Sequence, residues 1–295
     1  MVMPVYNRAD SVGRAVESVL AQDFTDFELI VVDDGSTDGT PEAVGATGDK
    51  RVRCLRQPSN MGGNAARNRG VREARAPLVA FIDSDDAYLP HKLGFLVRYF
   101  AEHPEVDALV DSFRLDYPLE KGKPPASRIN PVLTTSREVE EAVFARRLYK
   151  ATPAFCVRRD ALMEVGLFDE TLKRRQDMDL ILRLARTVNC ASTDQVLWVK
   201  QWSADSISAK QETFATAVIE MCERHPDYLT RPAFRTGLAR DVARHFLRLV
   251  AQGKLGAAAR DFRRCASFFG AGTFARLWGA GLWEMGRRLV TRREV

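Results

Sequence analysis

The sequence lacks the cysteine patterns that mark disulfide frameworks and zinc sites. Its five cysteines are far apart, odd in number and free of any CxxC spacing, so neither kind of site is predicted. No signal peptide opens the chain, and no charge-free run of about 18 apolar residues occurs in it. We therefore expect a cytoplasmic protein, in which peripheral contact with the inner face of the membrane stays open.

Several common catalytic motifs are also missing. GxGxxG and GxxxxGK[ST] are absent, which argues against a Rossmann dehydrogenase and a P-loop enzyme, and there is no GxSxG elbow. The four histidines are scattered along the chain and do not suggest a site.

The composition is that of a globular protein. The chain has 295 residues, of which 45% are apolar, enough for one large or two smaller domains. A formal net charge of +5 would suit an anionic partner, but the chain also has 39 acidic residues, so net charge is only weak evidence for such a partner. The basic residues are spread over many predicted helices rather than along one stripe with stacking aromatics, so nucleic acid is not an expected partner.

The first 110 residues alternate short β-type runs with helical patterns. Apolar residues recur at helical spacing over 12–20, and FELIVV at 27–32 is a continuous apolar run of strand length. Further strands are expected at 52–55 and 78–82, and further helices at 64–75 and 90–103. Such alternation predicts an α/β fold with a mostly parallel central sheet flanked by helices. The opening MVMPVYN looks like the second half of a buried strand whose first residues are missing.

Beyond residue 110 the pattern is mixed and then helical. Helices are expected at 136–147, 159–165 and 177–187, and over nearly all of the chain from 211 on. Near the C-terminus aromatic residues alternate with arginines, which suits either a helical cap with its aromatics packed inward or an interfacial helix on an anionic bilayer. The residues are Phe268, Phe269, Phe274, Trp278 and Trp283 with Arg276, Arg287, Arg288, Arg292 and Arg293.

Three polar segments directly follow predicted strands. PVYN (4–7) follows the first strand, DDGSTD (33–38) the second and DSDD (83–86) the fourth. Because ligands in open α/β sheets bind beyond the carboxyl ends of the strands, these segments are expected to gather along one edge of the sheet.

FIDSDD (81–86) crowds three carboxylates, which repel one another unless a cation, hydrogen-bond donors or water relieves the repulsion. One interpretation is a solvated turn or a helix cap. The other is a metal site, in which Asp83 and Asp85 share one direction if the strand pleat persists. Their hard oxygen atoms suit Mg²⁺ or Mn²⁺ bridging a diphosphate.

Three further segments each allow two interpretations. In DDGSTDG (33–39) the acids either cap a turn or accept hydrogen bonds from a base or ribose. In NMGGNAARNRG (60–70), Arg67 or Arg69 is either solvated or contacts a phosphate. In RRQDMDLILRLAR (174–186), Asp177 either stabilises the helix dipole or acts as a general base.

Taken in order, four segments resemble the inverting family 2 glycosyltransferases, which have the GT-A fold. The resemblance covers roughly residues 1 to 210. It implies a nucleotide-sugar donor, a divalent cation bound at the DxD sequence, and inversion at the anomeric carbon. The segments are PVYNRADSVGRAVESVLAQDFTDFELIVVDDGSTDGT, NMGGNAARNRG, FIDSDDAYLPHKL and QDMDLILRLAR.

The resemblance also implies roles for individual residues. Asp177 matches the general base, and Gln176 replaces the Glu that usually precedes it. In KQWSADSIS (200–208), Ser203 stands where a histidine is frequent, while Lys200 could supply charge and Trp202 could stack on a sugar. The expected metal ligands are Asp83 and Asp85, and the expected donor-binding residues are Pro4, Tyr6, Asn7, Asp33, Asp34, Arg67, Asp83 and Ser84.

The leading hypothesis is an inverting transferase of polysaccharide or glycoconjugate synthesis that uses Mn²⁺ or Mg²⁺. It would move a sugar from a nucleotide diphosphate sugar, expected to be a UDP-sugar, to an unknown acceptor that is a glycan or is lipid-linked. Residues 1–110 would form the nucleotide-sugar-binding half, 111–210 the acceptor half with the base, and 211–295 a helical extension. The alternatives are a nucleotidyltransferase, although PVYNRAD lacks the Gly-rich phosphate loop that such enzymes carry, and a non-catalytic nucleotide-sugar-binding protein.

Overall fold

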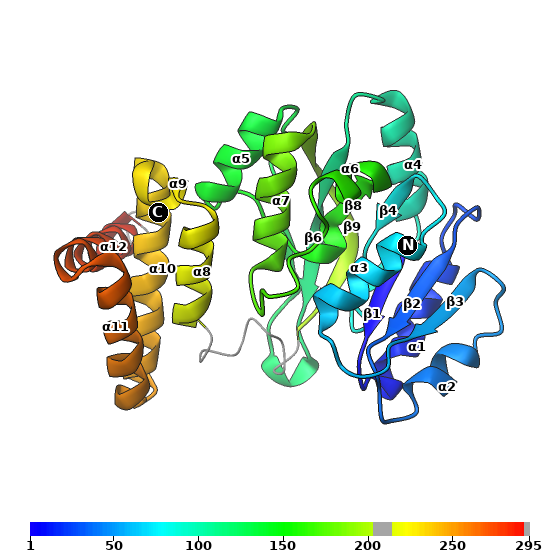
Figure 1. Ribbon diagram of the computed structural model, residues 1–295, viewed down its shortest axis with the longest axis horizontal. Coiled ribbons are helices and arrows are strands. Elements are labelled where there is room, and N and C mark those ends of the chain that lie inside the picture. Colours follow the sequence, from blue (N-terminus) through cyan, green and yellow to red (C-terminus); the bar gives the residue numbers. More distant parts are fainter. Residues whose placement is uncertain (203–213, 292–295) are drawn as a thin grey trace. The chain divides into compact units, whose positions relative to one another are not determined.

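The computed structural model describes residues 1–202 and 214–291, which form two compact units (Figure 1). Among the described residues, the first unit comprises 1–143, 147–171 and 176–202. The second comprises residues 144–146, 172–175 and the C-terminal helices.

The first unit begins with three parallel strands, which pair in the order β1-β2-β3. All five residues of β2 are buried, because helices cover this part of the sheet, and this explains why its sequence is a continuous apolar run. The strands are β1 (Val2–Val5), β2 (Leu29–Asp33) and β3 (Val52–Arg56), and the helices are α1 (Ala9–Leu20), α2 (Thr40–Gly45) and α3 (Gly63–Glu73).

The rest of the first unit is a mixed sheet in the order β4-β8-β6-β9-β5, with β7 paired to β6. Among the described residues, β6 and β9 pair in parallel and the other strand pairs of this sheet are antiparallel. A parallel bridge between Val2 and Phe81 links β1 to the end of β4. The strands are β4 (Leu78–Ala80), β5 (Ala87–Tyr88), β6 (Ala108–Asp116), β7 (Ala126–Arg128), β8 (Phe155–Arg158) and β9 (Cys190–Gln201).

The helices of this second half are α4 (Lys92–Glu102), α5 (Ser136–Phe144), α6 (Arg159–Glu164) and α7 (Gln176–Thr187), with 3₁₀ turns η1 (Leu119–Lys121) and η2 (Thr152–Ala154). The α/β fold and these helices are confirmed. Helix α5 ends three residues earlier than expected, because Arg146 has φ +56° and a helix cannot continue through a left-handed residue.

Two glycines of the expected motifs occupy positions where a side chain would not fit. Gly35, in the loop after β2, has φ +76°, and a Cβ there would lie 2.7 Å from the Ser59 carbonyl carbon. Gly70 lets α3 pack on β1, since a Cβ would lie 2.4 Å from a Val2 methyl group. The glycines therefore bring the loops after β2 and β3 together and hold α3 against the sheet.

A fully buried ion pair lies in the core beside β6 and β9. Lys92 Nζ donates to Asp111 Oδ2 at 2.5 Å and to the Pro153 carbonyl at 2.8 Å. Trp198 Nε1 donates to the other Asp111 oxygen at 2.9 Å. Both charged side chains are thus paired and hydrogen-bonded, as buried charges must be.

The second unit is built from helices, as expected. Asp241 of α10 pairs with Arg146 and Arg175, and His245 Nε2 lies 2.7 Å from Asp261 Oδ2 of α11. Phe246 packs against Phe262 and Phe274, and no helix of the described residues is long and apolar enough to cross a membrane. The helices are α8 (Phe214–Arg224), α9 (Asp227–Thr230), α10 (Pro232–Ala251), α11 (Leu255–Phe269) and α12 (Ala271–Thr291).

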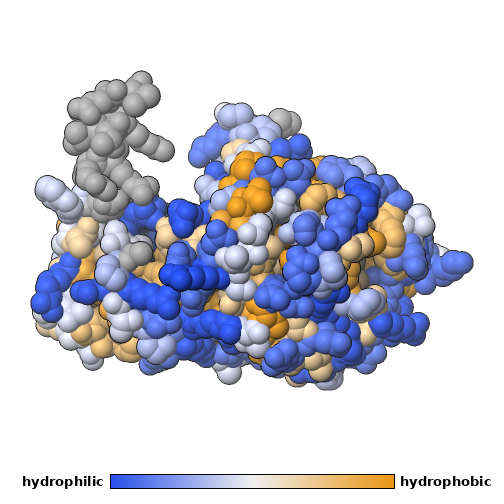
Figure 2. All heavy atoms as spheres, turned by 90° about the horizontal axis from the view of Figure 1, so that it is seen from above, coloured by the Kyte–Doolittle hydropathy of each residue, from blue (hydrophilic) through white to orange (hydrophobic). Residues whose placement is uncertain are grey.

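On the face drawn in Figure 2, hydrophobic residues reach the surface among a larger number of hydrophilic ones. Scattered apolar exposure of this kind is normal for a folded protein. This surface alone therefore does not mark a site.

Candidate functional site

The loop after β1 is fastened to the loop after β2. The Asn7 backbone N–H donates to Ser36 Oγ at 2.9 Å, and Asn7 Oδ1 accepts from the Thr37 N–H at 2.9 Å. Asn7 has φ +49°, a conformation that asparagine tolerates better than most residues. Its neighbour Tyr6 is 42% exposed, so this loop presents an aromatic ring to solvent beside the half-buried Pro4.

The two acids that end β2 are buried and bonded to the protein. Asp34 accepts from Gln57 Nε2 at 2.6 Å, from the Met61 N–H at 2.7 Å and from the Gly62 N–H at 2.8 Å. Asp33 accepts from the Ser36 N–H at 3.0 Å, and Arg56 lies 3.4 Å from its other oxygen. A carboxylate has about four acceptor positions, so Asp34 retains about one for a ligand.

The acids of FIDSDD lie in a turn rather than on a strand. Strand β4 ends at Ala80, and the Asp86 N–H donates to the Asp83 carbonyl at 3.1 Å. The strand pleat therefore does not continue through this segment. Strand alternation gives no reason for the side chains of Asp83 and Asp85 to point in the same direction. Ser84 between them is buried.

Arg67 is bound to the first of these acids. Its Nη2 donates to Asp83 Oδ1 at 2.7 Å, and its guanidinium lies 5.6 Å from the centre of the Phe168 ring. Arg67 is only 8% exposed, while the Asp83 side chain is 28% exposed. In this arrangement Arg67 orients Asp83. The neighbouring Arg69 donates to the Arg56 carbonyl at 2.7 Å.

The other two acids of the turn have raised pKa values. Burial raises the pKa of Asp85, and the charge of Asp83 adds to this effect, whereas Lys200 opposes it. Burial raises the pKa of Asp86 to about 8, again against the effect of Lys200. Asp86 Oδ1 accepts from the Gln201 N–H at 3.0 Å, and Lys200 Nζ lies 3.8 Å from Asp86 Oδ2.

Strand pairing explains why Lys200 lies among these acids. β5 and β9 are antiparallel with Ala87 opposite Val199, so the preceding residue Asp86 faces the following residue Lys200. Burial would lower the pKa of the Lys200 ammonium, but four nearby carboxylates raise it, those of Asp86, Asp83, Asp85 and Asp177. Lys200 thus interacts with both the acidic turn and Asp177, which lie more than 90 residues apart in sequence.

Asp177 lies in the first turn of α7 and is half-buried, and its Oδ1 accepts from the Met178 N–H at 2.8 Å. Two residues further, Asp179 is buried and pairs with Arg183 Nη2 at 2.6 Å. The two acids of QDMD therefore differ in environment: Asp179 is buried and paired with an arginine, whereas Asp177 is half-buried and its charge contributes to the raised pKa of Lys200.

Sequence reasoning missed the residues that hold the loop before α7. Asn68 Nδ2 donates to the Phe168 carbonyl and to Glu170, and its Oδ1 accepts from the Phe168 N–H. Asn64, one turn earlier on α3, donates to the Asp169 carbonyl. The N-x-x-x-N spacing in NMGGNAARNRG was an available signal, because it places both amides on one helix face.

The segment after β9 is described only in part. Lys121 lies 4.4 Å from the centre of the Trp202 ring, and the Trp202 N–H donates to the Asp116 carbonyl at 2.9 Å. Ser203, the expected departure from the histidine of the resemblance, lies outside the described residues.

The donor chemistry of Asp83 and Asp85 fits a hard divalent cation, since both offer carboxylate oxygens. Within residues 1–202 and 214–291, no three His, Cys, Asp or Glu side chains are close enough together to hold a metal ion. The protein therefore has carboxylates for part of a coordination sphere, and oxygen atoms of a ligand or of water would have to complete it.

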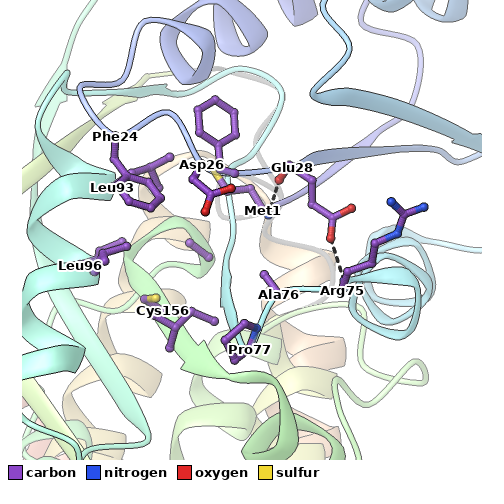
Figure 3. A pocket seen from close by; sticks show the side chains of 14 residues that line it. Met1, Phe24, Asp26, Glu28, Arg75, Ala76, Pro77, Leu93, Leu96 and Cys156 are labelled. Atoms are coloured by element: carbon purple, nitrogen blue, oxygen red, sulfur yellow. Dashed lines mark hydrogen bonds between the residues drawn. The ribbon is translucent and has the colours of Figure 1, made fainter.

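A cavity of about 580 Å³ lies elsewhere, at the amino ends of β1 and β4 (Figure 3). Met1 and Glu28 are among the residues that line this cavity. Most of the other lining side chains are apolar, among them Phe24, Leu93 and Leu96. This cavity is distinct from the acids, which follow the carboxyl ends of the strands.

The fold and the site define a class. A parallel β1-β2-β3 sheet followed by a mixed sheet, with helices around both, is the GT-A fold of glycosyltransferases. The glycosyl transferase family 2 model matches residues 1–166. The chain belongs to this family.

Curated relatives support the same assignment. The succinoglycan biosynthesis protein ExoO of Rhizobium meliloti (strain 1021) is 46% identical over 97 residues, which are 33% of this chain and 28% of ExoO. An uncharacterized glycosyltransferase of Rickettsia conorii (strain Malish 7) is 27% identical over 222 residues, 72% of this chain and 33% of the relative. The match thus spans about a third or less of each of these relatives.

Solved structures share the fold. TarS of S. aureus, residues 1–349 in complex with UDP-GlcNAc, superposes with a TM-score of 0.70 at 21% identity, covering 94% of this chain and 81% of that one. The mannosyltransferase PcManGT of Pyrobaculum calidifontis, in complex with GDP-Man and Mn²⁺, has a TM-score of 0.58 at 19% identity, covering 98% and 79%. The expectations of the family and of its GT-A fold are confirmed.

Proposed function

We propose that the protein is an inverting, metal-dependent glycosyltransferase that takes its sugar from a nucleotide diphosphate sugar. The observation that carries the proposal is Lys200, which interacts with the acidic turn 83–86 and with Asp177 at once. The charges of the proposed donor-binding acids and of the proposed base thus both raise the pKa of the same ammonium group. UDP-GlcNAc in TarS and GDP-Man in PcManGT support a nucleotide-sugar donor, and we propose a UDP-sugar.

The proposed donor site uses the loops described above. Tyr6, Pro4 and Asn7 would line the nucleotide pocket, and Asp34 would offer its remaining acceptor position to the base, with Asp33 beside it. Arg67 would orient Asp83, which would contact the ribose or the metal together with Ser84. We propose that residues 1–110 bind the donor, that residues 111–210 bind the acceptor and carry the base, and that residues 211–295 form a helical extension.

Asp83 and Asp85 would hold Mn²⁺ or Mg²⁺, which would neutralise charge on the leaving nucleoside diphosphate. The Asp177 carboxylate would accept the proton of the acceptor hydroxyl as its oxygen attacks the anomeric carbon. The bond from that carbon to the diphosphate oxygen breaks as the new glycosidic bond forms. A single displacement from the face opposite the leaving group inverts the configuration of the sugar.

The first prediction concerns the product and the base. Incubation with UDP-sugars and Mn²⁺ is expected to release UDP, whereas a nucleotidyltransferase would produce or consume pyrophosphate and a binding protein would release neither.

Asp177→Asn should lower kcat by roughly 10²–10⁴-fold and leave the Kd for UDP with Mn²⁺ within about twofold of wild type. Full turnover by Asp177→Asn would exclude this aspartate as the base.

The second prediction concerns the metal. Asp85→Ala should weaken Mn²⁺-dependent UDP binding by roughly tenfold or more, because it removes a carboxylate ligand. Isothermal titration calorimetry with UDP measures this, with Mn²⁺ and then with EDTA. Asp194→Ala, an exposed acid of β9, is the matched control and should bind like wild type. Equal affinity of Asp85→Ala and wild type would contradict the assignment.

A further inference from the structure

The helical unit has a strongly one-sided charge. Between residues 231 and 283 the sequence contains two aspartates and no glutamate. Asp241 pairs with Arg146 and Arg175, and Asp261 pairs with His245, so neither is exposed. The same stretch contains ten basic residues, Arg231, Arg235, Arg240, Arg244, Arg248, Lys254, Arg260, Arg263, Arg264 and Arg276. The surface of this stretch is therefore cationic.

Exposed aliphatic side chains are concentrated where α10 turns into α11, a corner visible at the lower end of the two helices in Figure 1. Leu247 is 43% exposed, Val250 53% and Leu255 63%. They fall within nine residues, around a turn in which Gly253 has φ +70°. Such close grouping of exposed apolar residues is uncommon on a surface that faces only water.

Cations flank these aliphatic residues. Arg244, Leu247 and Arg248 follow at i, i+3 and i+4, which places them on one face of α10, and all three are exposed. Lys254 is exposed directly before Leu255. We call these six residues the corner patch: Arg244, Leu247, Arg248, Val250, Lys254 and Leu255.

Most of the aromatic residues that the sequence places near the C-terminus pack inward. Phe274 is 1% exposed, and its ring lies 4.9 Å from that of Phe262. Phe268 and Phe269 contact each other with ring centres 4.8 Å apart and are half-buried. Among the aromatics singled out in the sequence, Trp283 is exposed, at 76%. Aromatics that pack inward correspond to the helical-cap interpretation.

We propose that the corner patch docks the protein on a bilayer that contains anionic lipids. Side chains of Leu247, Val250 and Leu255 would enter the boundary between headgroups and acyl chains, while the cations contact lipid phosphates. Nucleic acid and acidic glycans would attract the cations but offer no apolar phase to the aliphatic side chains. The combination of both kinds of residue therefore favours a lipid surface, and the contact is peripheral.

Co-sedimentation of the full chain with vesicles tests this proposal. The protein should bind vesicles of phosphatidylcholine with phosphatidylglycerol, bind vesicles of phosphatidylcholine alone at least roughly tenfold less, and be released by high salt. The Arg244→Gln, Arg248→Gln, Lys254→Gln variant should lose binding to the anionic vesicles. No sedimentation with either vesicle, or equal sedimentation with both, would overturn the proposal.

The aliphatic side chains need their own variant and control. Leu247→Ser, Val250→Ser, Leu255→Ser should weaken binding roughly tenfold or more. Ile129→Ser, Val132→Ser, Met163→Ser is the matched control, because these residues of the first unit are exposed by 48%, 62% and 44%, and it should bind like wild type. If the first variant keeps vesicle binding while heparin displaces both it and the wild type, the patch is a general polyanion site and the lipid proposal is wrong.

Discussion

At the scale of single residues, Lys200 determines the charge balance of the site. Its ammonium lies 3.8 Å from the nearest Asp86 oxygen and interacts with three further carboxylates. A cation among acids lowers their mutual repulsion, and it also competes with any metal ion that the same acids bind. In the proposed mechanism, Lys200 would therefore lower the repulsion within the acidic turn before a metal ion and a donor bind, and it would also lower the affinity for the metal ion.

Replacing this lysine should make metal binding tighter. Lys200→Gln removes a positive charge from the neighbourhood of a dication, so the Kd for Mn²⁺ without donor should fall by roughly tenfold, as isothermal titration calorimetry would measure. Lys200→Arg keeps the charge and should bind Mn²⁺ like wild type. Lys50→Gln, which changes an exposed lysine between α2 and β3, is the control for net charge. Weaker or unchanged Mn²⁺ binding by Lys200→Gln would contradict this account.

At the scale of elements, helix α3 connects the two halves of the first unit. Its N-terminus is held by Asp34 through the Met61 and Gly62 N–H groups. Its inner face holds Phe168 through Asn68, and the Phe168 ring packs edge-on against Phe81 with centres 5.3 Å apart. The same helix thus fixes the loop after β2 and the segment that leads toward α7.

Loss of the Asn68 amide should therefore affect stability and turnover together. Asn68→Ala leaves the buried Phe168 N–H and carbonyl without the partners they now have, which should cost about 2–4 kcal/mol. Urea titration would measure the loss, and kcat/KM should fall because the segment before Asp177 is released. The exposed Asn60→Ala, in the same segment of sequence, should change stability by less than about 0.5 kcal/mol. Equal stabilities of the two variants would refute the role of Asn68.

At the scale of the whole molecule, many helices and strands could be predicted from the sequence, whereas the side-chain contacts of the candidate site could not. The apolar spacing over 12–20 predicted α1, and the apolar run FELIVV predicted β2, because each pattern reflects the burial of a single local segment. Arg67 with Asp83 and Asp86 with Lys200 depend on how distant strands pair, which local periodicity does not contain. Strands β6, β8 and β9 lay in the region where the pattern was mixed, since β9 alternates buried and exposed stretches irregularly.

The stability of the whole molecule should also depend on pH, because His245 and Asp261 form a buried pair. Burial lowers the pKa of His245, although Asp261 opposes this effect. The folded helical unit therefore binds fewer protons than the unfolded chain below the ordinary histidine pKa of about 6.5, and its stability should fall as the pH drops through that value. Urea titrations at pH 7.5 and 5.5, followed by the helical circular dichroism signal, should show the loss in wild type and a smaller loss in His245→Gln. His91→Gln, which changes an exposed histidine of the first unit, should keep the wild-type difference. An undiminished loss in His245→Gln would mean that another group governs the acid response.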